Sequence, residues 1–411
     1  MRCSLSCILL LGPRSFAQSP DTAVLLGKAI FSGESRDMHR QARLFNATAC
    51  EACHGEGAGG IGPKGDGLLP TALVIQLAGQ ADSGAAEAAG DPVYGRIFNT
   101  RAAQGVQVEG VATVRYSEIE GHYYPGPLRW RMRQPHYQFT GLRGGPLAAS
   151  TVVKPRLAPP LYGAMLLEAV PESAITQVGI AASTHSSGEP AWHFYRGARV
   201  LGRLGWQGGS VSIRDQTAKA FAREMGLTSI DQPLDDCTAA EVDCLRQPRS
   251  GSPVDIPDDS LDAVLAYVRS LPAPPSPARS EQFLTGLKLF TDLGCAACHR
   301  PELPVEPAKG ADARAVISPF TDLRLHDLGI ELSDQTAGGA SVVSKWRTAP
   351  LWGLGSRTKS QDSSTLLHDG RARSVEEAVL WHSGEAARSR LNFMSLPGRK
   401  REALLLWLES L

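Results

Sequence analysis

The chain has 411 residues, with 42 basic and 42 acidic side chains, so its formal net charge is zero. This length is sufficient for two packed domains. A neutral balance gives no electrostatic footprint for nucleic acid or for an anionic membrane surface. No apolar run approaches the roughly 20 residues that a membrane-spanning helix requires. We therefore expect a protein that neither binds nucleic acid nor spans a membrane.

The first residues are typical of a secretory signal. Arg2 forms a short positive region, residues 8–11 lie in a short apolar stretch, and residues 15–17 (Ser-Phe-Ala) resemble a cleavage site before Gln18. We expect residues 1–17 to be removed on export. The mature protein is then expected in the periplasm.

The attachment motif of c-type haem, C-x-x-C-H, occurs twice: Cys50, Cys53 and His54 form one copy, and Cys295, Cys298 and His299 form the other. In this motif two thiols bond to the haem vinyl groups, and the adjacent histidine binds the iron. A four-cysteine zinc site or a disulfide framework is the alternative, but it leaves both histidines unexplained. The sequence therefore predicts two covalently bound c-type haems.

The remaining cysteines have simpler roles. Cys3 and Cys7 belong to the signal, which leaves Cys237 and Cys244 in a polar segment. A disulfide between them is expected in an oxidising compartment. A redox-active dithiol is the alternative, but the neighbouring carboxylates would raise the thiol pKa rather than lower it.

Periodicity and composition predict these segments: mostly helix 21–45, glycine-rich loop 55–67, strands and turns 91–142, helix 212–225, helix 258–271, proline-rich linker 272–277, helix 281–293 and closing helix 401–411. A helix, a haem motif, loops and a closing helix follow one another in a cytochrome c domain. We therefore predict a mainly α fold with two cytochrome c-like domains. The first, 18–271, carries a long irregular and β insertion. A linker, 272–279, joins it to the second domain, 280–411.

A short internal repeat supports duplication of a haem-binding module. The segment 156–163, with Arg-x-Ala-Pro-Pro-Leu-Tyr-Gly, is echoed at 347–353 by Arg-Thr-Ala-Pro-Leu-Trp-Gly. Each copy follows a haem motif.

Taken together, these residues resemble the bacterial dihaem oxidoreductases of the peroxidase and "thiol oxidoreductase" type, which are distant relatives of dihaem cytochrome c peroxidase. The matching stretches are 45–54, 156–170, 202–206, 224–229, 236–238, 322–329, 346–355 and 366–386. The resemblance implies a peroxidase-like enzyme. It would pass electrons from a redox donor protein or a small electron donor to peroxide or another small acceptor. The electrons would enter at the C-terminal haem.

The resemblance also suggests the sixth ligand of the second haem. In dihaem peroxidases an H-D-G motif precedes the distal ligand by fourteen residues, and here His368 precedes His382 by that spacing. His382 would complete a bis-histidine, low-spin site for electron transfer. Met394 is the alternative ligand, since many monohaem cytochromes place a methionine before the closing helix.

The first haem would be the substrate-side haem, and peroxide cleavage there needs a carboxylate that moves a proton. Alignment of 206–216 with the peroxidases favours Asp215. Alignment through the internal repeat favours Glu168 or Glu172 instead. The candidate distal ligands remain open: Met225, His193 and His122.

Two functions from different classes therefore remain. The first is a dihaem oxidoreductase with one open, reactive iron. The second is a pure dihaem electron carrier in which both irons are six-coordinate and indifferent to cyanide and peroxide.

A mass measurement tests the prediction of two covalently bound haems, on which both functions depend. The exported, mature polypeptide is expected to exceed its sequence mass by two haem groups that remain attached on denaturation, because thioether bonds are covalent. A mass without that increment would contradict the two-haem prediction.

Overall fold

The computed structural model describes residues 20–34, 42–79, 89–124, 126–177, 188–248, 252–306, 315–359 and 365–411, so the predicted signal lies outside it. Its helices are α1 (Pro20–Ser32), α2 (Glu51–His54), α3 (Ala164–Glu168), α4 (Glu172–Thr176), α5 (Ile213–Glu224), α6 (Val242–Arg246), α7 (Asp258–Ser270), α8 (Glu281–Asp292), α9 (Leu354–Lys359), α10 (Val375–Leu380), α11 (Ala387–Met394) and α12 (Gly398–Leu408).

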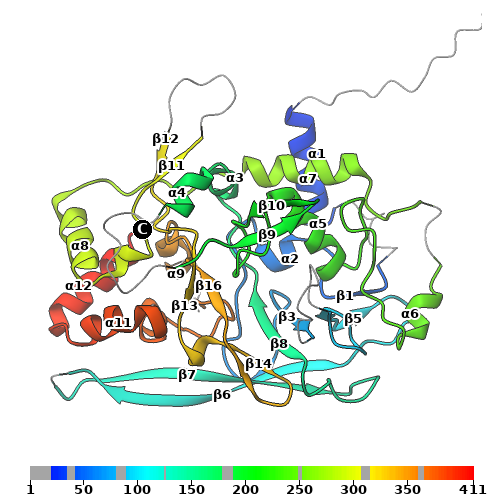
Figure 1. Ribbon diagram of the computed structural model, residues 1–411, viewed down its shortest axis with the longest axis horizontal. Coiled ribbons are helices and arrows are strands. Elements are labelled where there is room, and N and C mark those ends of the chain that lie inside the picture. The colour runs from blue at the N-terminus through cyan, green and yellow to red at the C-terminus, as the bar shows by residue number, and fades with distance from the viewer. Residues whose placement is uncertain are drawn as a thin grey trace, which may run out of the picture.

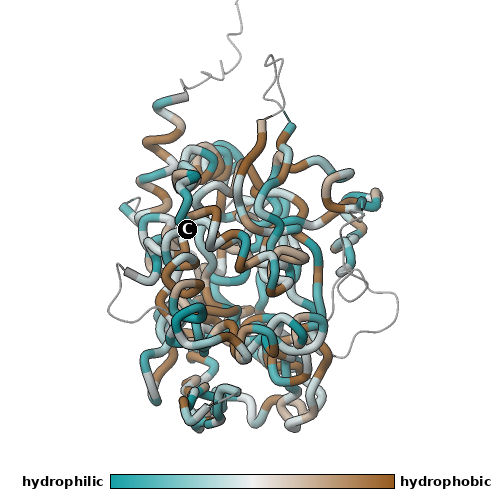
Figure 2. The backbone as a smooth tube through the Cα atoms, turned by 90° about the vertical axis from the view of Figure 1, so that its left-hand side faces the viewer, coloured by the Kyte–Doolittle hydropathy of each residue, from teal (hydrophilic) through white to brown (hydrophobic). Residues whose placement is uncertain are grey.

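The strands are β1 (Leu44–Phe45), β2 (Gly67–Leu68), β3 (Leu73–Ala78), β4 (Ile97–Phe98), β5 (Arg101–Ala102), β6 (Val111–His122), β7 (Arg129–Thr140), β8 (Val152–Leu157), β9 (Trp192–Tyr195), β10 (Ala198–Leu201), β11 (Leu303–Val305), β12 (Ala315–Ile317), β13 (Leu325–Asp327), β14 (Asp334–Thr336), β15 (Ser341–Val342) and β16 (Lys345–Arg347). Figure 2 shows hydrophobic and hydrophilic residues interleaved along the chain. Among the described helices, none has the length and apolar character needed to cross a membrane.

The prediction of a mainly α fold is wrong. The structure is 31% helical and 22% strand, and its strands form several small sheets. Strands occur in the C-terminal half as well as in the predicted insertion. The strands β11–β16 are all three residues or shorter, so they carry too little alternation to be recognised from sequence.

One sheet combines strands from both halves of the chain. Its order is β15-β14-β8-β3-β4, and β14 pairs antiparallel with β8 through Gln335 and Val153. A buried ion pair reinforces this contact: Arg156 on β8 donates two hydrogen bonds to Asp334 on β14, at 2.7 and 2.8 Å. Such bidentate pairs are strong and geometrically specific. The N-terminal and C-terminal halves are therefore tied together by backbone pairing.

A long hairpin, β6–β7, runs beneath both halves (Figure 1). Pro135 lies in β7, which is the outer strand of the β2-β6-β7 sheet, where the missing proline N–H interrupts no inner pairing. Two hydrogen bonds fix the hairpin to α10. The Tyr123 hydroxyl donates to Glu376 at 2.6 Å, and the Arg133 backbone N–H donates to Glu377 at 2.7 Å.

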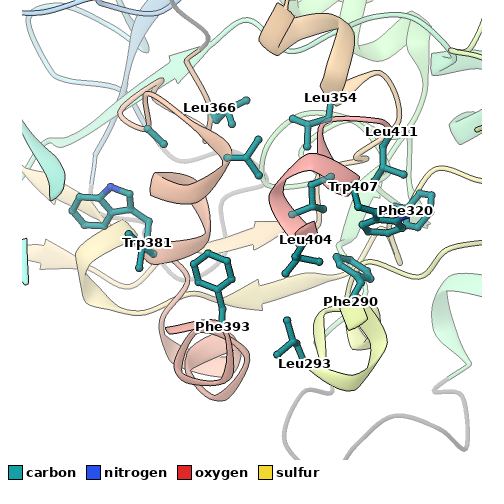
Figure 3. Packing of buried hydrophobic residues seen from close by; sticks show 14 of the residues in the cluster. Phe290, Leu293, Phe320, Leu354, Leu366, Trp381, Phe393, Leu404, Trp407 and Leu411 are labelled. Atoms are coloured by element: carbon teal, nitrogen blue, oxygen red, sulfur yellow. The ribbon is translucent and has the colours of Figure 1, made fainter. Parts of the chain in front are cut away.

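Two helical cores flank the sheets. In the first, α7 buries the predicted apolar face against α1 and α5: Leu261, Val264, Leu265 and Val268. In the second, α8, α10, α11 and α12 surround the second haem motif. Trp407 of α12 lies against Phe290 and Phe320, with ring centroids 5.2 and 5.8 Å apart (Figure 3).

The two copies of the short repeat pack against each other reciprocally. A Cβ atom on Gly163 would lie 2.6 Å from the Trp352 ring, and a Cβ atom on Gly353 would lie 2.8 Å from the Tyr162 hydroxyl. Both glycines have positive φ, at +70° and +71°. Glycine is needed at both positions because no side chain fits and the backbone is left-handed.

Gly163→Ala is therefore expected to lower the free energy of unfolding by about 1–3 kcal/mol, through backbone strain and the clash with Trp352. Chemical denaturation of the purified holoprotein measures this. Gly398→Ala is the matched control, because Gly398 begins α12 with open space around its Cβ position. Equal effects of the two substitutions would contradict the proposed packing.

Candidate haem sites

The first C-x-x-C-H motif forms the wall of a cavity of about 330 Å³. Cys50 precedes the short helix α2, which carries Cys53 and His54 and ends at Gly55 with φ of 53°. All three motif side chains line the cavity. The cavity falls in the usual size range of cofactor sites.

His54 is oriented for metal binding. Its Nδ1 donates to the carbonyl oxygen of Pro159 at 2.9 Å, because a carbonyl can only accept. Burial lowers the pKa of His54, so the ring is neutral and the Nε2 lone pair is available. Histidine ligands in metalloproteins are commonly fixed in this way.

The cavity lining suits haem in both polarity and charge. Its apolar part includes Phe31, Leu161, Leu204, Phe221 and Val264. Its cationic side chains are Arg156, Lys219, Arg223, Arg347 and Arg357, and the single carboxylate among the described lining residues is Glu224. Arg156 and Lys219 are already paired with Asp334 and Asp215. The wall still carries excess positive charge, which fits a flat apolar group with two carboxylates.

The second motif brings two histidine rings close together. Cys295–Ala297 forms a 3-10 turn after α8, and His299 follows with its Nδ1 donating to Phe320 at 3.0 Å. His382, after α10, donates from Nδ1 to Ala378 at 2.7 Å. The two ring centroids are 6.4 Å apart. Burial, together with His382, lowers the pKa of His299 to about 4, so this ring is neutral as well.

This spacing fits one metal between the rings. A metal–imidazole bond is about 2 Å long, and a ring centroid lies about 1 Å behind its ligand nitrogen, so two axial imidazoles have centroids about 6 Å apart. Met394 packs against the same hydrophobic cluster, but the ring that faces His299 is that of His382. The geometry therefore favours His382 over Met394 as the candidate sixth ligand.

The four motif thiols do not form a common zinc site. In the described ranges, the one group of three or more potential ligand atoms within 4.8 Å is Cys298, Asp322 and His326. This group joins one motif cysteine to a histidine that the sequence left unassigned. Burial alone would lower the pKa of His326, but its hydrogen bonds to Asp322 and Cys298 raise the pKa to about 11.

The remaining cysteine pair lies at disulfide-bonding distance. The Cα atoms of Cys237 and Cys244 are 5.9 Å apart, within the range that disulfides require. Cys244 is fully buried in a small apolar cluster with Leu44 and Val106. This setting fits a structural disulfide rather than a reactive dithiol.

The two predicted catalytic carboxylates do not line the first cavity. Asp215 is 2% exposed, accepts the N–H of Val211 at 3.1 Å and pairs with Lys219 at 3.0 Å. Glu168 accepts the N–H of Ile213 at 2.9 Å and pairs with Arg269. Both carboxylates accept backbone hydrogen bonds at the start of α5. Their catalytic assignment stays a prediction.

Glu224, at the end of α5, does line the cavity. Its Oε2 atom is inaccessible to solvent and has no hydrogen-bond partner among the described residues. Burial raises the pKa of Glu224 to about 7, against the opposing charge of Arg223. Helical periodicity could have indicated this position. Gln216, Ala220 and Glu224 are spaced four residues apart among apolar neighbours, so they lie on one face of the helix.

Helices α5 and α10 are equivalent elements of the two halves. Each follows a small bridged turn, Leu204 to Ser210 and Leu366 to Ala372. Each begins at a serine N-cap whose side chain accepts the N–H three residues later, Ser212 for α5 and Ser374 for α10. This capping fixes the helix start.

Counting from these caps gives the correspondence between the two sites. His382 is eight residues after Ser374, and Ala220 is eight residues after Ser212. Ala220 lines the first cavity. The three candidate distal ligands of the first site, Met225, His193 and His122, are absent from its lining. Among the described residues that line the first cavity, His54 is therefore the one histidine.

Residues 147–411, more than half of the chain, match the family described as "Di-haem oxidoreductase, putative peroxidase". The chain belongs to this di-haem oxidoreductase family. The resemblance inferred from sequence is thereby confirmed. The match contains the second haem motif, and the first motif lies N-terminal to it.

Two solved structures are similar to this di-haem oxidoreductase at a low level. A MauG-like protein associated with microbial copper homeostasis is 13% identical, with 98% of this chain and 95% of that chain covered and a TM-score of 0.38. Hydrazine synthase of Kuenenia stuttgartiensis is 16% identical over 44% of this chain, with a TM-score of 0.26, and the match spans 65% of that chain. At these TM-scores neither structure defines the fold or the activity. No curated protein matches the sequence.

His382→Ala tests the second site of the di-haem oxidoreductase. Loss of the facing imidazole is expected to convert one low-spin haem signal to high spin in the electron paramagnetic resonance spectrum of the oxidised protein. His122→Ala, at an exposed position of β6, is the control. The same conversion in Met394→Ala, with His382→Ala unchanged, would assign the ligand to Met394 instead.

Proposed function

We propose that the protein is a periplasmic, peroxidase-like dihaem c-type oxidoreductase. Electrons would enter at the C-terminal site and leave to peroxide or another small acceptor at the N-terminal site. Cys50, Cys53, Cys295 and Cys298 would tether the two haems. His54, His299 and His382 would bind iron.

When bound, the haem irons supply electron-carrying centres, and an iron with an open sixth position supplies a binding site for peroxide. The observation that carries the proposal is Ala220. It stands where the equivalent helix of the other half leads to His382, and a methyl group offers no ligand atom. The first site is therefore built to leave room on the side that faces α5.

Glu224 lies one helical turn beyond Ala220 and supplies the proton chemistry. Reduction of one peroxide molecule to two water molecules takes up two electrons and two protons. The Glu224 carboxyl group, which belongs to the cavity lining, would accept the proton of one peroxide oxygen and return it to the other. A pKa of about 7 suits a group that both accepts and donates at neutral pH.

The two halves would divide the work. The second site, packed by α8, α10, α11 and α12, holds two opposed histidines and suits electron transfer. The first site has a cavity, a carboxylate oxygen with no hydrogen-bond partner among the described residues, and an alanine at the position equivalent to His382. The proposed domains, 18–271 and 280–411 joined by 272–279, then correspond to a substrate side and a donor side. The donor is a redox protein or a small reductant.

Glu224→Gln is expected to lower the rate of reaction with peroxide by about 10²–10⁴-fold, because the amide cannot accept the proton. In the unmodified protein the carboxylate is the active base, so the rate rises with pH through about 7 and then levels off. Glu224→Gln is expected to lose this pH dependence. Stopped-flow spectroscopy measures both quantities.

Two comparison variants decide between carboxylates. Asp215→Asn and Glu168→Gln are expected to keep the pH dependence of the peroxide reaction, because neither side chain lines the cavity. Loss of the rate in either one, with Glu224→Gln active, would move the catalytic role to that residue. Spectra of the unmodified protein that cyanide and peroxide both leave unchanged would instead establish the pure electron carrier.

A further inference from the structure

A histidine that neither candidate haem site uses as a ligand lies against the second haem motif. His326 belongs to β13, and its Nδ1 atom lies 3.6 Å from the Sγ atom of Cys298. Only 2% of this residue is exposed. The sulfur that would join the second haem to the chain therefore has a buried imidazole ring as a direct neighbour.

Each nitrogen of the His326 ring faces a carboxylate. Nε2 lies 2.9 Å from Oδ2 of Asp322, and Nδ1 lies 2.9 Å from Oε2 of Glu385. A carboxylate only accepts hydrogen bonds and a neutral imidazole has one N–H, so the doubly protonated ring is the form that satisfies both contacts. Burial alone would raise the pKa of both carboxyl groups, but their hydrogen bonds to His326 lower it. The three groups therefore form a buried imidazolium between two carboxylates.

A segment of the N-terminal half separates this ring from water. A Cβ atom on Gly188 would lie 2.4 Å from Cε1 of His326, so the glycine backbone lies directly against the ring. The Gly188 carbonyl accepts a hydrogen bond from Arg324 at 2.7 Å, and Glu189 forms a β-bridge with Leu325. A charge in such a water-excluded place acts more strongly on its neighbours than a surface charge, because the local dielectric constant is lower.

We propose that His326 is a positioning residue of the second haem, and that its imidazolium charge beside the Cys298 sulfur raises the reduction potential of that haem. The inference rests on the proposed function, because it needs a haem attached at Cys298. A nearby cation favours the reduced haem, since reduction adds a negative charge. Asp322 and Glu385 hold the ring in place and offset its charge.

This arrangement bears on electron entry. A higher potential makes the second haem a better acceptor of electrons from the donor. The two carboxylates limit the increase, because together with the imidazolium they leave the group with one net negative charge. The potential would therefore depend on the balance of the three charges, and each substitution in the group has a predictable sign.

Midpoint potentials of both haems, measured by spectroelectrochemistry on the purified holoprotein, test the inference. The first and second haems are distinguished by their high-spin and low-spin spectra. His326→Gln is expected to lower the ratio of reduced to oxidised second haem about tenfold at a fixed applied potential, which corresponds to about 59 mV for one electron. Asp322→Asn is expected to shift the potential in the opposite direction, because it removes a negative charge. The first haem is expected to stay unchanged in both variants.

The double variant His326→Gln/Asp322→Asn separates charge from structure. It restores the net charge of the group without restoring the imidazole, so the potential of the second haem is expected to return close to that of the unmodified protein. A merely structural role would move both single variants in the same direction and the double variant at least as far. That result, or an unchanged potential of the second haem in both single variants, would overturn the inference.

Glu385→Gln keeps the experiment informative if Asp322→Asn fails to fold. It also removes one negative charge and is expected to raise the potential, and its side chain is 26% exposed. His122→Gln, at an exposed position of β6, is the matched control for loss of an imidazole. Peroxide reactivity of the unmodified protein tests the proposed function separately. A two-haem protein that does not react with peroxide would contradict that function, and the potential shifts would still decide the role of His326.

Discussion

Three histidine rings are each fixed by a hydrogen bond from Nδ1 to a backbone carbonyl, and both candidate haem sites depend on these bonds. The pairs are His54 with Pro159, His299 with Phe320 and His382 with Ala378. A carbonyl only accepts, so the proton of each neutral ring is on Nδ1 and the Nε2 lone pair is free. Burial lowers the pKa of all three rings and keeps them neutral. The backbone carbonyls thus determine which ring nitrogen of each histidine is free to bind a metal.

The same kind of helix start occurs in the two halves but leads to different residues. Serine caps place α5 and α10 in equivalent positions, but the eighth residue from the cap is alanine in one and histidine in the other. Glu224, one turn farther along α5, has no partner for its Oε2 atom among the described residues. In the proposed function, this histidine-to-alanine difference and the nearby Glu224 carboxyl group would separate a reactive site from an electron-transfer site.

The sequence alone predicts the local features well. The two C-x-x-C-H motifs, the start of α5 near Ser212 and the spacing from His368 to His382 depend on residues close together in the chain. Features that depend on residues far apart in the chain could not be predicted. The sequence around Asp334 does not indicate its ion pair with Arg156, which is 178 positions away. The short strands β14 and β16 have no recognisable pattern.

Glu224 was missed for a related reason. Its position on the cavity side of α5 is readable from helical periodicity, but its lack of a partner is a tertiary property. Asp215 and Glu168 are equally acidic in sequence and differ only in what surrounds them. The chemistry of a buried carboxylate is decided by its neighbours, which the sequence does not place.

The pairing of β14 with β8 also bears on the maturation of the chain. Strand β8 has an incomplete edge until residues 334–336 arrive, and these follow the first haem motif by more than half the length of the protein. In the proposed export from the N-terminus, Cys50 and Cys53 would emerge long before the sheet beside their cavity closes. Haem attachment would then have a period in which Cys53, buried in the finished fold, is still accessible.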